Sequence, residues 1–399
     1  MLSFYHIKSR DYLFYISFFI LLTTSIIRST FYFHFIKGFI ANSLILFSII
    51  VLIADQFLSV KIKSKEIIGL LFMVLLFGLS FLGKSNSAET MFSASIVLLY
   101  CARNRNLEQI FSFAFVVTAL ELLFIVCSSF IGLIPDVVLK QVGRNRHCLG
   151  FLYALHPSTH MFNLTAIWCY LRRKKIGLFD LLIFGILNIY FYYLTMSRTT
   201  FAMSIILILS FIFLKSHLRV NKVSKLIQGV MVSSVVLLSM ISIWLMLSYS
   251  KGVFWMNKLN SVLSGRLRLA SLSYTKHGVS ILPRHITWTG NGMDAYGNVS
   301  TKDYDYLDNL YLQLLIHFGI IFFIIIIIAL TLVLYHCVKD KQYHLSIILI
   351  FIAIHSFLDN LSMYLEFNSF LFVIFIVLLS KIKAKNRFSL KKSSKKLLL

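Results

Sequence analysis

The chain has 399 residues, of which 58% are hydrophobic and 14% charged, and its mean hydropathy is +0.83. A soluble domain of this length cannot bury so many apolar side chains, so the composition excludes an ordinary soluble enzyme. Much of the formal net charge of +24 lies in loops between apolar segments. Such charge orients helices in a membrane, so we expect no nucleic-acid partner.

About twelve apolar segments follow one another, at roughly residues 12–27, 38–58, 67–82, 88–102, 110–134, 150–171, 176–194, 200–214, 226–248, 309–335, 345–358 and 367–380. Most are long enough to form a helix that crosses a bilayer. The pattern predicts an all-α fold, a single polytopic membrane bundle over residues 1–399. The first segment lacks a small-residue cleavage site, so we expect a retained helix and not a signal peptide.

Lysine and arginine alternate between the two sides of these segments. With the N-terminus inside, the cytoplasmic stretches carry 25 of the 39 lysines and arginines and the external stretches carry 14. The positive-inside rule therefore predicts that both termini are cytoplasmic. The basic tail, residues 381–399, is expected to lie against the lipid headgroups of the inner leaflet.

Arginines on the predicted outer side precede the long loop. Arg144 and Arg146 lie in QVGRNRHCLGF, and Arg198 lies in YLTMSRTTFAMS, between two apolar segments with almost no room for a loop. An ionised guanidinium is costly at the bilayer centre, but at the outer face it can reach the interface.

Ionisable residues also occur within the apolar segments. His156 and His160 are four residues apart beside Pro157, so they share a helix face, and we expect them to line a cavity near the external end. Glu121 is either a functional group or a structural hydrogen-bond partner of a neighbouring helix. The five cysteines show no CxxC spacing, so we expect no metal site, cofactor or disulfide framework.

A long external loop, residues 249–308, is rich in aromatic residues, glycine and arginine, and we expect it to be folded. It adds Arg266 and Arg268 to the outer cations. Guanidinium groups bind phosphate oxygens through two parallel hydrogen bonds, which suits a lipid-linked pyrophosphate at this depth. The alternative is that these arginines bind anionic lipids or pair with the loop's aspartates.

The loop runs into the next apolar segment through YDYLDNLYLQLL, residues 304–315. Asp308 and Asn309 are either helix caps or polar groups of a site, in which Asp308 is the general base for a sugar hydroxyl. Tyr304, Tyr306 and Tyr311 either stack on sugar rings or form an aromatic belt.

The order of these motifs over residues 140–380 resembles that of the bacterial Wzy-type polymerases of O-antigen and capsular polysaccharide, which are related to the O-antigen ligases. The motifs are R-x-R-x-x-x-G-F from Arg144 to Phe151, a following His-Pro, S-R-T at 197–199, S-G-R-L at 264–267, G-N-G at 290–292 and D-N-x-Y-L at 308–312.

The resemblance implies a metal-independent glycosyltransferase without a cofactor in the bacterial cytoplasmic membrane. It would join oligosaccharide repeat units linked to undecaprenyl pyrophosphate, at the outer face. Arg198 and Arg266 match the family's arginines and would stabilise the leaving pyrophosphate, with Asp308 as the third catalytic residue. The residues expected to bind substrate are Arg144, Arg146, His156, Arg268, Asn309 and Tyr311.

Two other functions remain open. In the ligase relatives a histidine commonly precedes the asparagine of the last motif, whereas this chain has Asp308 there, which favours a polymerase. A flippase for the same lipid would place its charges near the bilayer midplane and often shows paired halves. Besides membrane lipids, polysaccharide-export and chain-length proteins are further partners that the sequence leaves open.

Overall fold

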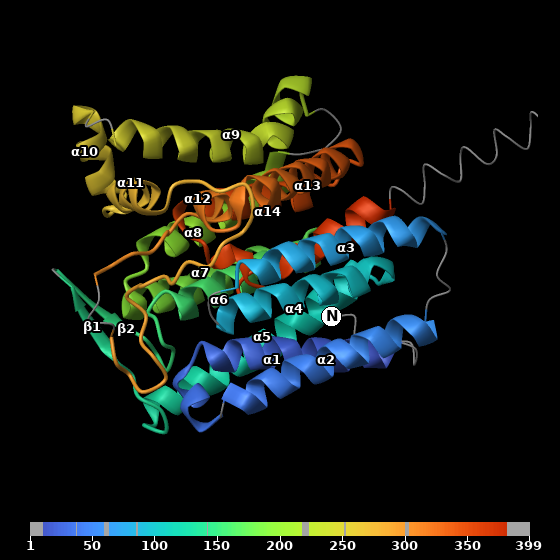
Figure 1. Cartoon of the computed structure of the whole chain (residues 1–399), viewed down its shortest axis with the longest axis horizontal. Coiled ribbons are helices and arrows are strands. Elements are labelled where there is room, and N and C mark those ends of the chain that lie inside the picture. The colour runs from blue at the N-terminus through green and yellow to red at the C-terminus, as the bar shows by residue number, and fades with distance from the viewer. Residues whose placement is uncertain are drawn as a thin grey trace, which may run out of the picture.

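The computed structural model describes residues 11–36, 38–59, 64–84, 87–141, 143–217, 223–250, 253–299 and 303–380. The basic tail 381–399, predicted to face the cytoplasm, lies outside the described residues. The fold is all-α, as predicted, and most helices run roughly parallel to one another (Figure 1). The helices of the first half are α1 (Tyr12–Arg28), α2 (Gly38–Ser59), α3 (Ser64–Leu82), α4 (Ser87–Cys101), α5 (Leu107–Phe130), α6 (His156–Arg172) and α7 (Leu178–Thr195).

The second half continues with α8 (Arg198–His217), α9 (Lys225–Ser250), α10 (Phe254–Val262), α11 (Arg266–His277), α12 (Leu310–Ile316), α13 (Gly319–Lys339) and α14 (Tyr343–Leu358). A last apolar helix covers Ser369–Ser380. Short 3₁₀ turns η2 (Phe31–Phe35), η3 (Ala102–Asn104), η4 (Leu361–Met363) and η5 (Ser369–Leu371) complete the described helical structure.

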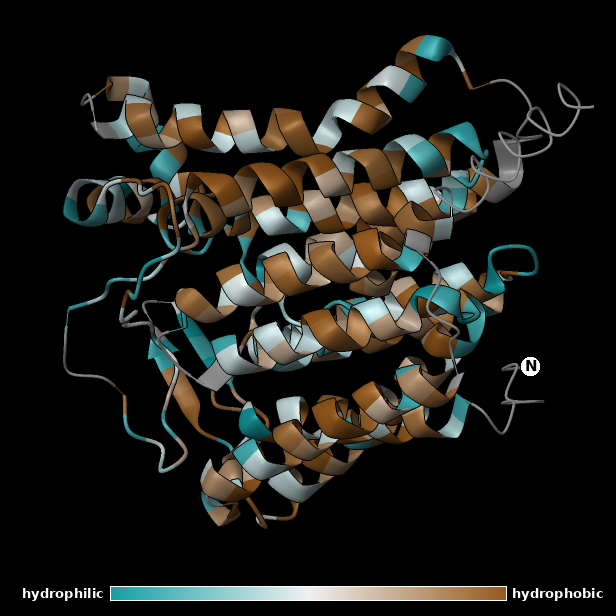
Figure 2. Cartoon of the chain, turned by 45° about the vertical axis from the view of Figure 1, so that its right-hand side comes forward, coloured by the Kyte–Doolittle hydropathy of each residue, from teal (hydrophilic) through white to brown (hydrophobic). Residues whose placement is uncertain are grey.

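Among the described residues, five helices are long and apolar enough to cross a membrane. They are Gly38–Leu58, Leu107–Phe130, Leu178–Thr195, Lys225–Tyr249 and Gly319–Lys339. Hydrophobic residues make up much of the helices in Figure 2, and side chains such as Phe57 and Phe179 are about three-quarters exposed. Apolar side chains on the outside of a helix are stable where lipid replaces water, so the structure supports a membrane protein.

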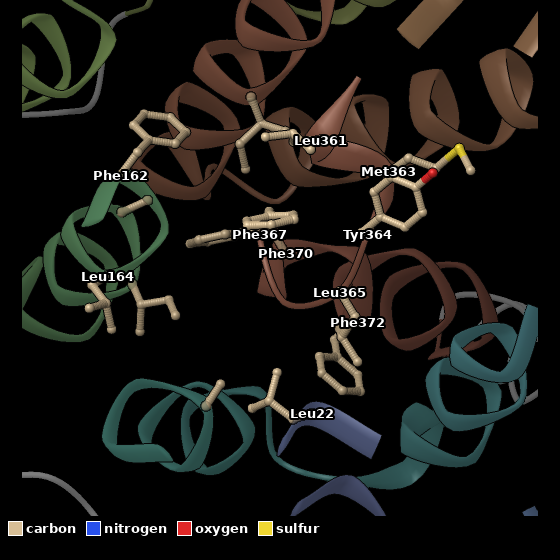
Figure 3. Close-up of a cluster of buried hydrophobic side chains, with 14 of the residues drawn as sticks. Leu22, Phe162, Leu164, Leu361, Met363, Tyr364, Leu365, Phe367, Phe370 and Phe372 are labelled. Carbon is tan, nitrogen blue, oxygen red and sulfur yellow. The ribbon is translucent and has the colours of Figure 1, made fainter. Parts of the chain in front are cut away.

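Aromatic side chains pack the centre of the bundle. Phe14 and Phe18 of α1 contact Phe372 of the last helix, with ring centroids 6.5 and 4.9 Å apart. Figure 3 shows Phe367, Phe370 and Phe372 between helices from distant parts of the chain. The C-terminal segment 361–375 is therefore part of the core, which fixes the position of the polar residues at its start.

Two features differ from the predicted pattern. The segment predicted as one helix at 309–335 is divided into α12 and α13 at Gly319, which has a φ of +78°. A Cβ there would lie 2.8 Å from backbone atoms of Leu282, so only glycine allows this approach. Residues predicted as loop form an antiparallel hairpin of β1 (Val138–Gln141) and β2 (Arg144–His147). Consequently α6 begins at His156 and not near residue 150.

The hairpin, α10 and α11 gather at one end of the bundle, on the left in Figure 1. The segment after α11 runs as coil and is joined by isolated bridges, Thr289 with Asp305 and Met293 with Val299. Met293 also donates its backbone N–H to the carbonyl of Leu152, 2.9 Å away. The stretch predicted as a folded loop is thus fastened over the end of the bundle.

Candidate functional site

A cavity of about 360 Å³ lies where the coil segment covers the bundle. Six parts of the chain line it: the end of α1, Met91 of α4, the segment 152–156, the glycine-rich turn 290–293, the segment 304–308 and the segment 359–367 after α14. These parts are far apart in sequence, so only the folded chain creates the cavity.

Asp308 is the central carboxylate of this cavity. Its Oδ2 lies 3.7 Å from Nε of Arg266 and 3.4 Å from the hydroxyl of Tyr304, which donates to it. Burial raises the pKa of Asp308, and the positive charge of Arg266 opposes that rise. A carboxylate with a raised pKa and room beside it is suited to accept a proton near neutral pH.

A second carboxylate, Asp359, lies in the same cavity. Its Oδ1 accepts the backbone N–H of Leu361 at 2.7 Å, and its side chain is almost fully buried. Burial and then the negative charge of Asp308 raise the pKa of Asp359 to about 7. Burial and the charge of Asp308 thus both favour the neutral form of Asp359.

Four arginines form a cluster at this end of the bundle, and none of them is among the residues that line the cavity. Partial burial and three neighbouring positive charges lower the pKa of Arg144. Those charges belong to Arg146, Arg198 and Arg266. Arg146 also acts on Asp308 electrostatically. Neighbouring positive charges repel one another, so binding of an anion with several oxygens would stabilise the cluster.

Local structure explains how these arginines reach one place. The hairpin packs against the end of α7, where Nε of Arg146 donates to the carbonyl of Thr195 at 3.0 Å. Met196 has a φ of +50° and ends α7, so that Arg198 begins α8 two residues later. Gly265, with a φ of +87°, precedes α11 and Arg266 in the same way.

Aromatic and amide groups cover the rest of the cavity. Tyr153, Tyr304 and Tyr306 line it, and the ring of Tyr306 lies 3.4 Å from where a Cβ on Gly290 would be. The amide of Asn360 donates to the Tyr306 hydroxyl at 2.8 Å. Flat aromatic faces beside polar groups are suited to bind sugar rings.

His156, predicted to bind substrate, lines the cavity at the first turn of α6. Its ring centroid lies 5.0 Å from that of Phe367. His160 is fully buried one turn further along. Within the described residues, no group of three histidine, cysteine or acidic side chains is placed to hold a metal ion.

Three residues predicted to bind substrate lie elsewhere. Arg268 is exposed on α11, two positions after Arg266 and hence on the opposite face of the helix. Asn309 caps α12 and donates to Ser242 Oγ at 3.1 Å and to the carbonyl of Phe357 at 2.8 Å. Tyr311 is buried, and its hydroxyl donates to the carbonyl of Ala353 at 2.9 Å. Asn309 and Tyr311 therefore join helices, and none of the three lines the cavity. The predicted arginines Arg144, Arg146, Arg198 and Arg266 do not line it either, and Arg266 reaches it only through Asp308.

Sequence reasoning missed Asp359, Asn360 and Glu366, all of which line the cavity. One signal was present. The tetrapeptide Leu-Asp-Asn-Leu occurs at 307–310 and again at 358–361. Glu121, for which two roles were open, accepts a hydrogen bond from Thr23 of α1 at 2.5 Å, which agrees with the structural role.

Comparison of the chain with models of protein families, with curated proteins and with solved structures found no match.

Proposed function

We propose that this protein polymerises oligosaccharide repeat units linked to undecaprenyl pyrophosphate, at the outer face of a bacterial cytoplasmic membrane. The observation that carries this proposal is a partly buried carboxylate, Asp308, which lies in an aromatic-lined cavity and pairs with Arg266, one of a cluster of four arginines at the same end of an apolar helical bundle. This arrangement offers a place for a diphosphate, a base and a sugar side by side. The order of the sequence motifs supports the same assignment.

In the proposed reaction, Asp308 accepts the proton of an acceptor sugar hydroxyl while that oxygen forms a bond to the anomeric carbon of the donor. The bond between the anomeric carbon and the pyrophosphate breaks, and its electron pair leaves with the lipid pyrophosphate. Arg198 and Arg266, with Arg144 and Arg146 nearby, stabilise the negative charge that develops on the leaving group. Because this charge grows in the transition state, its stabilisation raises the rate and not only the affinity.

The proposal includes about twelve membrane spans, the segment 249–308 outside and both termini in the cytoplasm. Alternate helix ends support it: α1 and α14 end near the cavity, whereas α6 and α12 begin there. At other helix ends, Arg103 after α4 pairs with Glu66 in the first turn of α3. Cysteine substitutions at 198 and 266 should react with an impermeant reagent added outside intact cells. Protection of both positions would contradict the topology.

A direct test uses the purified protein in detergent with lipid-linked repeat units as the only substrate. A polymerase lengthens them into a ladder of glycans that remain on the lipid, whereas a flippase moves them across a bilayer without lengthening them. A ligase transfers them to a different acceptor. We expect Arg198→Ala to form no ladder and Arg268→Ala to form a normal one, since Arg198 belongs to the arginine cluster and Arg268 lies on the opposite face of α11 from Arg266. A chain that never lengthens the substrate would contradict the proposal.

A further inference from the structure

A second cavity, of about 180 Å³, adjoins the first at Arg28. It is an apolar groove between α1 and the start of α2, and its lining includes Phe19, Ile20, Ala41 and Leu44. Phe19 is about half exposed on the outside of the bundle. Arg28 lines both cavities, so one guanidinium stands between a polar site and an apolar groove.

The Arg28 guanidinium makes few and weak contacts with the described residues. One terminal nitrogen donates to Oδ1 of Asn42 at the long distance of 3.4 Å, and the group lies 5.3 Å from the centroid of the Phe33 ring. Its Nε is buried and has no hydrogen-bond partner among the described residues. A buried donor without a partner favours a ligand that supplies an acceptor oxygen.

Arg28 is separate from the four-arginine cluster. Among the described residues, the charge that acts on it is that of Glu366, whereas Arg146, Arg198 and Arg266 act on Arg144. In Figure 1, α1 lies on the opposite side of the bundle from α11, which carries Arg266. The carboxylates Asp308 and Asp359 line the cavity that Arg28 borders. The cavity therefore has Arg28 at one side and the four-arginine cluster near the other.

We propose that Arg28 and the groove between α1 and α2 bind a second polyprenyl pyrophosphate, the one that carries the acceptor glycan. This inference rests on the proposed function, because a polymerase must hold two lipid-linked substrates at once. The pyrophosphate contacts Arg28, the isoprenoid chain lies in the groove, and the glycan enters the cavity toward Asp308.

The unequal number of cations at the two positions indicates which position binds the donor lipid and which binds the acceptor lipid. The donor pyrophosphate gains negative charge as its bond to sugar breaks, so several arginines are useful there. The acceptor pyrophosphate keeps the same charge throughout the reaction. It needs only to be positioned, for which one arginine and an apolar groove suffice.

The test counts bound lipids by native mass spectrometry of the full chain with undecaprenyl pyrophosphate. We expect two lipids on the unaltered protein and one on Arg28→Ala, with affinity for the lost site reduced about tenfold or more. Arg28→Lys should retain part of that affinity. Ala41→Phe, which fills the groove and keeps the cation, should also lose one lipid. Lys84→Ala is the matched control, since Lys84 is an exposed cation that lines neither cavity.

Competitors identify the ligand. Excess phosphatidylglycerol should leave both lipids bound, and inorganic pyrophosphate should compete at Arg28 only weakly, because it has no chain for the groove. Two lipids on Arg28→Ala, equal losses with Lys84→Ala, or displacement by phosphatidylglycerol would each contradict the inference. If lipids are lost as expected but no ladder forms with any substrate, the proposed function fails and the lipid site remains. If Arg28→Ala forms a normal ladder, the acceptor site fails and the proposed function remains.

Discussion

The tetrapeptide Leu-Asp-Asn-Leu occurs twice, at 307–310 and 358–361, and the two copies do different things. In the first copy, Asp308 pairs with Arg266 and Asn309 caps α12. In the second, Asp359 accepts a backbone N–H, and the amide of Asn360 reaches the hydroxyl of Tyr306. No ion pair among the described residues involves Asp359. The same two residues thus differ in role between the copies. In the first copy the aspartate forms the ion pair in the cavity, whereas in the second copy the asparagine donates to a tyrosine that lines the cavity.

The difference comes from neighbouring charges. Both aspartates are desolvated, which raises the pKa of each. Arg266 favours the ionised form of Asp308, and the ionised Asp308 in turn favours the neutral form of Asp359. In the proposed reaction Asp308 is therefore the base of the pair, and Asp359 is the group more inclined to keep its proton. Four sets of substitutions test this comparison.

The largest expected effect is that of Asp308→Asn. The substitution removes the base and should lower the rate of ladder formation about 10²–10⁴-fold, while the lipid-linked donor still binds. Asp359→Asn should keep most of the rate at neutral pH, because asparagine resembles the protonated acid. Rates of lengthening and donor binding are measured for both proteins. Equal losses in the two variants would contradict the assignment of the base.

Removing a guanidinium should come next. Arg198→Ala and Arg266→Ala should each lower the rate about 10²–10³-fold, the usual loss for a group that stabilises transition-state charge. Lysine at either position should not restore it, because an ammonium lacks the paired donors. Arg266→Ala should also move the acid side of the pH–rate profile upward, since Asp308 loses its nearest positive charge. The profile of Arg198→Ala provides the comparison, and normal polymer from either alanine variant would count against the site.

Asp359→Asn should stabilise the protein in a pH-dependent way. The folded-state pKa of about 7 exceeds the ordinary value of 3.8. Below about pH 4 the carboxyl is therefore protonated in both the folded and the unfolded protein and does not change the free energy of unfolding. Between about pH 4 and pH 7 the carboxyl ionises in the unfolded chain but stays protonated in the folded one, so stability is lost over this range and levels off above pH 7. At pH 8 the substitution should therefore stabilise the protein by roughly 2–4 kcal/mol, and at pH 4 hardly at all. Thermal unfolding in detergent at both values measures this, and an equal gain at the two would show that folding does not raise the pKa of Asp359.

The smallest effects separate the two asparagines. Asn309→Ala removes the cap of α12 and the links to Ser242 and Phe357, and should destabilise the protein by about 1–2 kcal/mol. The catalytic rate of the protein that remains folded should change little. Asn360→Ala should instead raise KM for the acceptor, because it frees the Tyr306 hydroxyl. Thermal unfolding and steady-state rates are measured for both variants. A rate loss confined to Asn309→Ala would contradict the roles given to the two asparagines.

The positions of the helices were largely predictable. Apolar segments such as 12–27 and 226–248 coincide with α1 and α9 within a few residues, because a lipid-facing helix is apolar around its whole circumference and leaves a long signal. The break at Gly319 was not predictable, since it depends on the backbone of Leu282 approaching from another segment. The hairpin of β1 and β2 was missed because four-residue strands leave almost no periodic pattern.

For the candidate site, local sequence was enough to identify the residue types and motifs: Arg144, Arg146, Arg198 and Arg266 beside apolar segments, and an aspartate at 308. It took the fold to show that Asp308 and Asp359 line one cavity, whereas Arg268, Asn309, Tyr311 and the four arginines do not line it. The charge state of a carboxyl depends on desolvation and on charges a few ångströms away. Those neighbours come from segments up to hundreds of residues distant, so no local pattern records them.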